Sequence, residues 1–206
     1  MMRYALHGLV LASALFAASC VSVLPDAAPP KPRFHIVAAD ADSLSGEPLP
    51  FSLVIDEPRA TRVYDSVRIA VASAPGRIEY LAGAEWADRA PRLFQTALIQ
   101  TFEDAGRILA VGDRSSLPIA DFVLQTDIRR MELAVQGGHA ADISVYARLT
   151  NGKGVIYAAK KFEASISSSS TKPDAVYAAF NTGFDQIVTE MVAWSYAEGE
   201  RANSRK

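Results

Sequence analysis

The chain has 206 residues, of which 50% are hydrophobic and 21% are charged, with 12 glycines and 11 prolines. This is the composition of an ordinary globular domain, and it excludes a collagen, a coiled coil or a long disordered protein. The formal net charge of -2 lacks the basic excess of nucleic-acid-binding domains, and the single cysteine allows no internal disulfide and no cysteine-built zinc or iron–sulfur site.

The first twenty residues have the pattern of a secretion signal. Arg3 precedes an apolar run from Gly8 to Phe16. That run is too short for a transmembrane helix, because spanning a bilayer takes about 20 apolar residues. Small residues then lead directly to the only cysteine, Cys20, an arrangement that resembles the bacterial lipobox. The resemblance implies that residues 1–19 are a lipoprotein signal peptide and that the Cys20 thiol is acylated.

The lipid anchor has one competing interpretation. An ordinary signal peptidase could remove the same segment and leave Cys20 as a free N-terminal thiol, which would be a liability in an oxidising compartment. Several acyl chains would hold the protein on a membrane stably, whereas one chain would not. Val21, and not an aspartate, follows the cysteine; in the Gram-negative sorting pattern this resembles outer-membrane proteins. We therefore expect a lipid anchor at the periplasmic face of the outer membrane.

Proline dominates the segment that follows the signal peptide. Residues 20–33 contain Pro25, Pro29, Pro30 and Pro32, so we expect a semi-rigid, extended tether there. Such a tether would hold a folded domain away from the membrane surface. We predict a single α/β domain over residues 34–198 and a flexible tail over 199–206.

The first half of the domain has the pattern of strands followed by a helix. Apolar or alternating runs predict strands at 34–38, 51–58, 66–73 and 77–81. The dipeptide Pro75-Gly76 predicts the turn between the last two strands.

The helix that follows has start and stop signals of its own. It begins near Asp88, which can cap it, and Pro91 is tolerated in its first turn. Gly106 is a typical C-terminal stop. Between them the apolar residues recur every four positions and form a buried stripe. These residues are Phe94, Leu98 and Phe102.

The second half repeats the order of strands and a helix. A strand is predicted at 108–112 and a long one at 121–136, where the apolar phase switches near Arg129–Arg130 and so predicts a bulge. Strands at 143–150 and 155–162 flank a hairpin turn that begins with Asn151-Gly152.

Thr171 is expected to cap the last helix, with Asp174 near its positive end. Six apolar residues follow at helical spacing up to about Glu198. They are Val176, Phe180, Phe184, Ile187, Met191 and Trp194. The order of elements predicts an α/β fold: a mixed β-sheet with two long helices packed on it.

Side chains that could carry catalysis do not converge in this pattern. The histidines His35 and His139 lie on separate elements. The aspartates Asp40 and Asp42 miss the spacing of a calcium-binding loop. A third group of carboxylates is explained by a solvated face and a helix cap; its members are Glu79, Glu85 and Asp88. We therefore expect no catalytic residues, no metal site and no cofactor, and hence no enzyme.

The stretch from Arg77 to Ile108 carries the most distinctive signature. A strand with Tyr80 leads through a short loop to Trp86, and a helix with Pro91 in its first turn then ends at Gly106. This order, with VYDSVRIAV just upstream, resembles the ABC-type transport auxiliary lipoproteins, the PqiC-like partners of MCE transport systems. The resemblance extends over the mature chain in outline.

The resemblance implies a fold like the N-terminal domain of TolB and a place in the periplasm. It also implies partners: an MCE-domain protein and an ABC permease and ATPase, which together move phospholipid or other hydrophobic molecules between membranes. The chain itself would have a non-catalytic docking role and would contact the membrane through its lipid; a homo-oligomer is compatible with this.

Three residues are the candidates for a partner interface: Tyr80, Trp86 and Arg89. Tryptophan is enriched in binding hot spots, but Trp86 could equally pack over the start of the helix and fix the loop. Two other functions stay open at this point. The protein could carry lipid in an apolar cavity of its own, or it could be an envelope scaffold.

Overall fold

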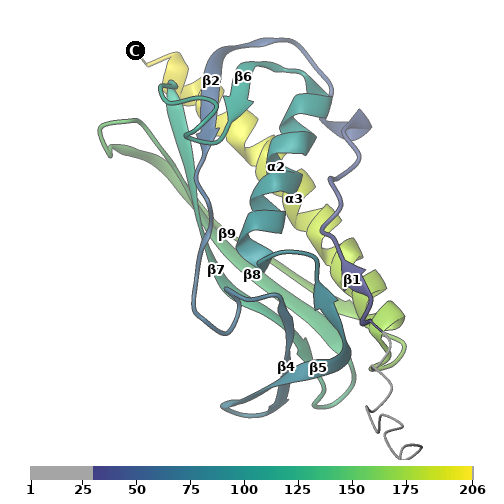
Figure 1. Cartoon of the computed structure of the whole chain (residues 1–206). Helices are drawn as coiled ribbons and strands as arrows, with labels where there is room; N and C mark the ends of the chain where they lie inside the picture. The colour runs from purple at the N-terminus through teal and green to yellow at the C-terminus, as the bar shows by residue number, and fades with distance from the viewer. Residues whose placement is uncertain (1–29, 206) are drawn as a thin grey trace, which may run out of the picture. The chain divides into compact units, whose positions relative to one another are not determined.

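One mixed sheet of nine strands organises residues 30–205, which are the residues that this computed structural model describes. Two long helices, α2 and α3, lie side by side and cover the sheet (Figure 1). This confirms the predicted α/β fold. The strands are β1 (Arg33–Phe34), β2 (Leu49–Ile55), β3 (Arg59–Ala60), β4 (Arg68–Ala74), β5 (Arg77–Trp86), β6 (Ile108–Gly112), β7 (Phe122–Ala134), β8 (Ala140–Thr150) and β9 (Ile156–Ser167). The helices are η2 (Asp42–Leu44), α2 (Ala90–Ala105) and α3 (Pro173–Asn203).

The long strand β7 joins the two parts of the sheet. Along one of its edges β2, β3 and β4 pair with it in succession, all of them parallel. Along its other edge it pairs antiparallel with β8, which in turn pairs with β9. The sheet continues outward from β2 to β6 and from β4 through β5 to β1. On the edge of β7 that faces β2 and β3, Gln125 and Thr126 lie between the parts that these two strands cover and have no strand partner there among the described residues.

The predicted bulge in β7 is confirmed. Ile128 pairs with Val145 and Arg130 pairs with the next residue, Ser144, so that Arg129 is the extra residue. After the bulge Met131 is buried, as Ile128 is before it. The extra residue therefore keeps both halves of the strand facing the same core although their sequence phases differ.

The predicted hairpin between β8 and β9 is also confirmed, and both strands are longer than expected. The Asn151 side-chain oxygen accepts hydrogen bonds from the backbone N–H groups of Lys153 and Val155. This satisfies the backbone of the turn locally, as asparagine does in such turns.

Helix α2 has the predicted stripe and stop but a different start. Phe94, Leu98 and Phe102 are all buried, and Gly106 adopts the left-handed conformation, with φ +61°, that ends the helix. Asp88 does not cap it, because Arg89 occupies the N-cap position and no side chain supplies a capping bond. The Asp88 carboxylate instead accepts the backbone N–H of Arg89.

Helix α3 corrects two predictions. Thr171 does not cap it, since Lys172 holds the N-cap position without a side-chain capping bond. The helix also continues to Asn203, so the flexible tail predicted over 199–206 is wrong for most of its length. The physical reason is packing: Ala202 is buried, and Gly199 brings the helix backbone against the ring of Phe51.

The start of the domain also differs from the prediction. The strand expected over 34–38 is reduced to β1, which pairs with β5. Lys31 forms an ion pair of 2.9 Å with Glu85, so the last residues of the predicted tether belong to the folded domain, which begins at Lys31. Cys20, the signal peptide and the rest of the tether lie outside the described residues.

Strand β5 runs without interruption from Arg77 to Trp86, where a loop was expected after Tyr80. The extra residues of β5 are accommodated by an irregular register against β4, in which Tyr80 pairs with Ala70 and Glu85 with Arg68. Among the residues described, no helix combines the length and the apolar character that crossing a bilayer requires.

Candidate functional site

Trp86 lies in the core. Its side chain is 2% exposed, and its ring meets those of Phe180 and Phe184 edge-on, with centroids 5.4 and 6.1 Å apart. Edge-to-face contacts of this kind add to the stability that burial provides. The side chain therefore fixes the end of β5 against α3. Of the two roles considered for Trp86, partner contact and packing within the domain, its position agrees with packing.

Tyr80 lies on the β4–β5 hairpin and is partly exposed. The guanidinium of Arg68 stacks over its ring at 3.7 Å from the centroid, which is the geometry of a cation–π contact. The pair forms an aromatic and cationic spot on the surface of the hairpin.

Arg89 connects three segments that are distant in sequence. From the start of α2 it forms ion pairs with Glu57, in the connection after β2, and with Asp65, in the turn after β3. These hydrogen bonds, first of all the one to Glu57, raise the pKa of the Arg89 guanidinium. Its side chain stays 42% exposed, so Arg89 both organises the surface and is accessible on it.

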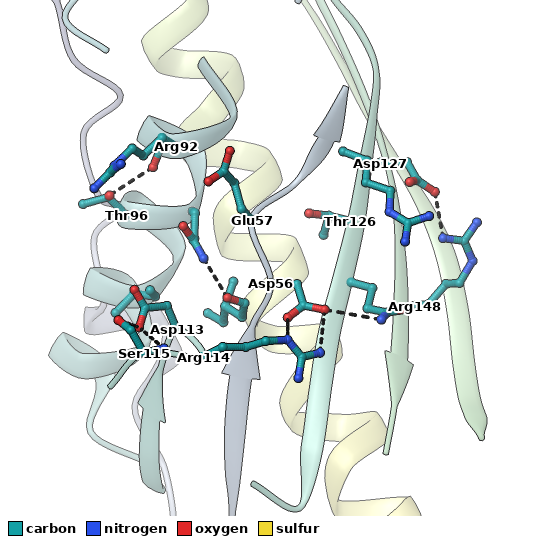
Figure 2. Close-up of a pocket in the computed structure, with 15 residues that line it drawn as sticks. Asp56, Glu57, Arg92, Thr96, Asp113, Arg114, Ser115, Thr126, Asp127 and Arg148 are labelled. Atoms are coloured by element: carbon teal, nitrogen blue, oxygen red, sulfur yellow. Dashed lines mark hydrogen bonds and ion pairs between the residues drawn. The ribbon is translucent and has the colours of Figure 1, made fainter. Parts of the chain in front are cut away.

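A groove of about 540 Å³ opens beside α2, where β2 leaves the edge of β7. Figure 2 shows the side chains that line it. They come from α2, from the end of β2 and the connection after it, from β3, from the loop after β6 and from the strands β7 and β8. Apart from Ile55 and Ile99, every lining residue is polar or charged. We call this hollow the α2 groove.

The four acidic residues of the α2 groove all have partners. Asp56 pairs with Arg114 at 2.6 Å and also accepts a hydrogen bond from Gln125, while Asp127 pairs with Arg148 at 2.7 Å. Glu57 is held by Arg89. Asp113 accepts hydrogen bonds from Ser115 and Ser116 in its own loop.

The bonds to Asp113 have an electrostatic consequence. The hydroxyl of Ser115, followed by the backbone N–H and the hydroxyl of Ser116, donates to the carboxylate and stabilises its charged form. These bonds lower the pKa of Asp113 from 3.8 to about 2. The loop after β6 is thus held by an ionised aspartate over the whole physiological range.

Of the four arginines of the α2 groove, Arg114 and Arg148 form ion pairs with acids of the groove, and the other two do not. Within residues 30–205, Arg59 forms neither an ion pair nor a hydrogen bond through its side chain. The Arg92 side chain has only Asp88, which lies just before the start of α2, at 3.5 Å, and it is 65% exposed. The unengaged charge of the groove is therefore positive.

Thr126 lies on β7 and lines the α2 groove among its charged side chains. It is 3% exposed, and its hydroxyl has no hydrogen-bond partner among the described residues. In Figure 2 it lies between Glu57 and Asp127. Buried hydroxyls are nearly always hydrogen-bonded, since leaving one without a partner costs free energy.

The other candidates from the sequence do not form a site. Glu79 accepts a hydrogen bond from Ser73, Glu85 pairs with Lys31 and Asp88 with Arg92, so these carboxylates do not converge. His35 and His139 are both exposed. In the described part of the chain, no group of three or more histidine, cysteine or acidic side chains could hold a metal ion.

The α2 groove was not predicted from the sequence. Arginines and acids spread over residues 55–148 look like ordinary surface charge, and the signal that distinguishes them is whether each has a partner in the folded chain. Thr126 gave no signal, because a threonine in a strand is a common residue.

Comparison with known proteins identifies the class. The family model of the ABC-type transport auxiliary lipoprotein component matches residues 35–192. The chain belongs to this family, which confirms the resemblance seen in the stretch from Arg77 to Ile108.

Individual relatives agree with this assignment. The crystal structure of XCC0632 from Xanthomonas campestris, of the family DUF330, has a TM-score of 0.71 and 30% sequence identity, and covers 84% of this chain and 98% of its own. A second solved structure, of an uncharacterized protein, has a TM-score of 0.62 at 11% identity, and so shares the fold alone. The protein bll6063 of Bradyrhizobium diazoefficiens is 33% identical over 147 residues, which are 70% of this chain but 39% of that relative.

Proposed function

We propose that this protein is a lipid-anchored, non-catalytic docking component of an ABC transport system that contains an MCE-domain protein and moves phospholipid or other hydrophobic molecules between membranes. One observation carries the proposal: the auxiliary-lipoprotein family covers residues 35–192, downstream of a signal-like segment that ends at Cys20 and of the proline-rich segment that follows it. The acylated Cys20 anchors the chain at the periplasmic face of the outer membrane, and the proline-rich segment sets the distance to the domain.

The chemistry of the α2 groove supports docking over transport of cargo by this chain alone. A cavity for acyl chains would be lined mainly by apolar side chains, whereas Ile55 and Ile99 are the only apolar residues along this groove. Elsewhere in the described domain the apolar faces of α2 and α3 are buried in the core. Tyr80 and Arg89 are the proposed partner-facing residues, since both are accessible, and Trp86 supports them from the core.

Co-purification from membranes tests this function. Chain tagged at its C-terminus and extracted in detergent is expected to bring down an MCE-domain protein and ABC components, identified by mass spectrometry. Tyr80→Ala combined with Arg89→Gln is expected to reduce their yield, whereas Arg77→Gln with Lys153→Gln, which changes two exposed residues at hairpin turns, is expected to leave it unchanged. Recovery of the tagged chain without any such component would refute the transport role.

The anchor has a separate test. Labelled palmitate is expected to be incorporated into the wild-type chain and not into Cys20→Ser, and the variant is expected to leave the membrane fraction. A Cys20→Ser chain that stays equally membrane-bound would exclude lipid at Cys20 as the anchor.

A further inference from the structure

We infer that the α2 groove is a binding site for an acidic segment of a partner protein, whose carboxylates are held by Arg59 and Arg92 and which also takes a hydrogen bond at Thr126. This inference deepens the proposed docking function by naming the chemistry of the partner, and it rests on that function only for the identity of the partner. It arises from three observations on the groove: its charge balance, its buried hydroxyl and its shape.

The charge balance selects a negative ligand. Four arginines and four acids line the groove, so that the count alone predicts no preference. Each acid, however, is engaged by an arginine or by hydroxyl and backbone donors. By contrast, Arg59 has no partner in the described domain, and Arg92 has only an exposed contact of 3.5 Å to Asp88, just before α2. The donors that remain available are guanidinium groups, and these bind carboxylates with charge-assisted hydrogen bonds.

The buried hydroxyl of Thr126 selects a ligand that enters the groove. Its neighbours Gln125 and Asp127 have partners of their own in Asp56 and Arg148, whereas the Thr126 oxygen has none within residues 30–205. A hydroxyl can donate to a carboxylate or to a backbone carbonyl. A ligand group placed beside Thr126 would therefore satisfy a polar atom that folding leaves unpaired.

The shape of the groove selects an extended ligand. Arg92 lies on the wall formed by α2. Arg59 lies on β3 at the opposite wall, where its backbone is in register with that of Asp127 on β7. Thr126 lies between the two walls (Figure 2). A chain with carboxylates at intervals can reach arginines on both walls, and this favours an extended ligand over a single compact anion. With only Ile55 and Ile99 as apolar lining, the groove offers no surface for the acyl chains of an anionic lipid.

A peptide titration tests the inference without the transport system. Fluorescein-labelled hexaglutamate is titrated with the purified full-length chain in detergent, and fluorescence anisotropy is measured. We expect saturable binding that weakens as the NaCl concentration rises, because the contact is electrostatic. Arg59→Gln combined with Arg92→Gln is expected to weaken binding roughly tenfold or more, since two charge-assisted contacts are removed.

Matched variants separate the groove from general surface charge. Arg77→Gln combined with Lys153→Gln removes the same number of positive charges from two hairpin turns outside the groove and is expected to leave the affinity unchanged. Thr126→Val keeps the shape of the side chain and removes the hydroxyl; it is expected to weaken binding severalfold while the melting temperature stays the same or rises. Labelled hexalysine is expected not to bind.

Four results would overturn the inference. The first two are that hexaglutamate does not bind to the wild type, or that it binds equally to the wild type and to the Arg59→Gln, Arg92→Gln chain. The third is that the control variant loses as much affinity as the groove variant. The fourth is that inorganic phosphate displaces the peptide when it supplies the same concentration of negative charge as the peptide does. The last result would assign the groove to a compact anion. None of these results bears on co-purification with the transport system, so the docking function would fail or stand by its own test.

Discussion

The contact between α3 and the sheet and the α2 groove use their side chains in opposite ways. At α3 the rings of Trp86, Phe180 and Phe184 fill the space between helix and sheet, and a glycine lets the helix approach Phe51. In the α2 groove a buried hydroxyl and an arginine have no partner in the described chain. In the first region apolar rings pack against one another and fill the space between helix and sheet, whereas the second region combines an unpartnered hydroxyl with an unpaired arginine along an open groove. The effects of substitutions on the free energy of unfolding should therefore differ in size and in sign between the two regions.

The largest effect is expected for Trp86→Ala. Removing a buried tryptophan leaves a cavity against Phe180 and Phe184 and should lower the free energy of unfolding by about 3–5 kcal/mol. Chemical denaturation measures this value. Tyr80→Ala, on the partly exposed hairpin, is the control and should cost far less; similar losses for the two variants would contradict the assignment of Trp86 to the core.

A smaller loss is expected for Gly199→Ala. Alanine favours a helix over glycine by about 1 kcal/mol, but here a Cβ would lie 2.5 Å from a ring atom of the buried Phe51. We therefore expect net destabilisation by about 1–3 kcal/mol. Phe51→Leu in the same chain removes the ring and should make Gly199→Ala less harmful, and a stabilising Gly199→Ala would show that α3 is not closely packed there.

The opposite sign is expected in the α2 groove. Thr126→Val removes a buried hydroxyl that has no partner in residues 30–205, so the free energy of unfolding should rise by about 1 kcal/mol in the absence of a ligand. Thr101→Val is the matched control: the Thr101 hydroxyl is also buried but donates to Ala97 and accepts from Ala39, and this variant should be destabilised. Loss of stability in both variants would mean that Thr126 has a partner in the folded chain.

The smallest effect is expected at the rim of the groove and depends on pH. The pKa of Asp113 is lowered from 3.8 to about 2, so its stabilising effect is present above the higher value and is lost as the pH falls through the lower one. The difference in melting temperature between wild type and Asp113→Ala should thus be constant near neutral pH and should shrink between about pH 4 and pH 2. A difference that persists below this range would contradict the assigned hydrogen bonds.

Local patterns in the sequence determined the order of the elements and several of their details. The change of apolar phase at Arg129 predicted the bulge in β7, Asn151 predicted the hairpin, and the spacing of Phe94, Leu98 and Phe102 predicted the buried face of α2. The signature around Trp86 and Gly106 also led to the correct family. These signals are readable because side-chain periodicity and turn chemistry act over a few neighbouring residues.

Only the tertiary structure decided which charges are engaged and where α3 ends. Arg89 finds its acids in two other segments, and Arg59 stays without a partner in the described domain although acids line the same groove. The last turns of α3 are held by Phe51, which is far away in sequence. Ion pairing and close packing depend on distances between segments that meet only after folding, so the sequence specified the residues of the α2 groove without indicating that they form one site.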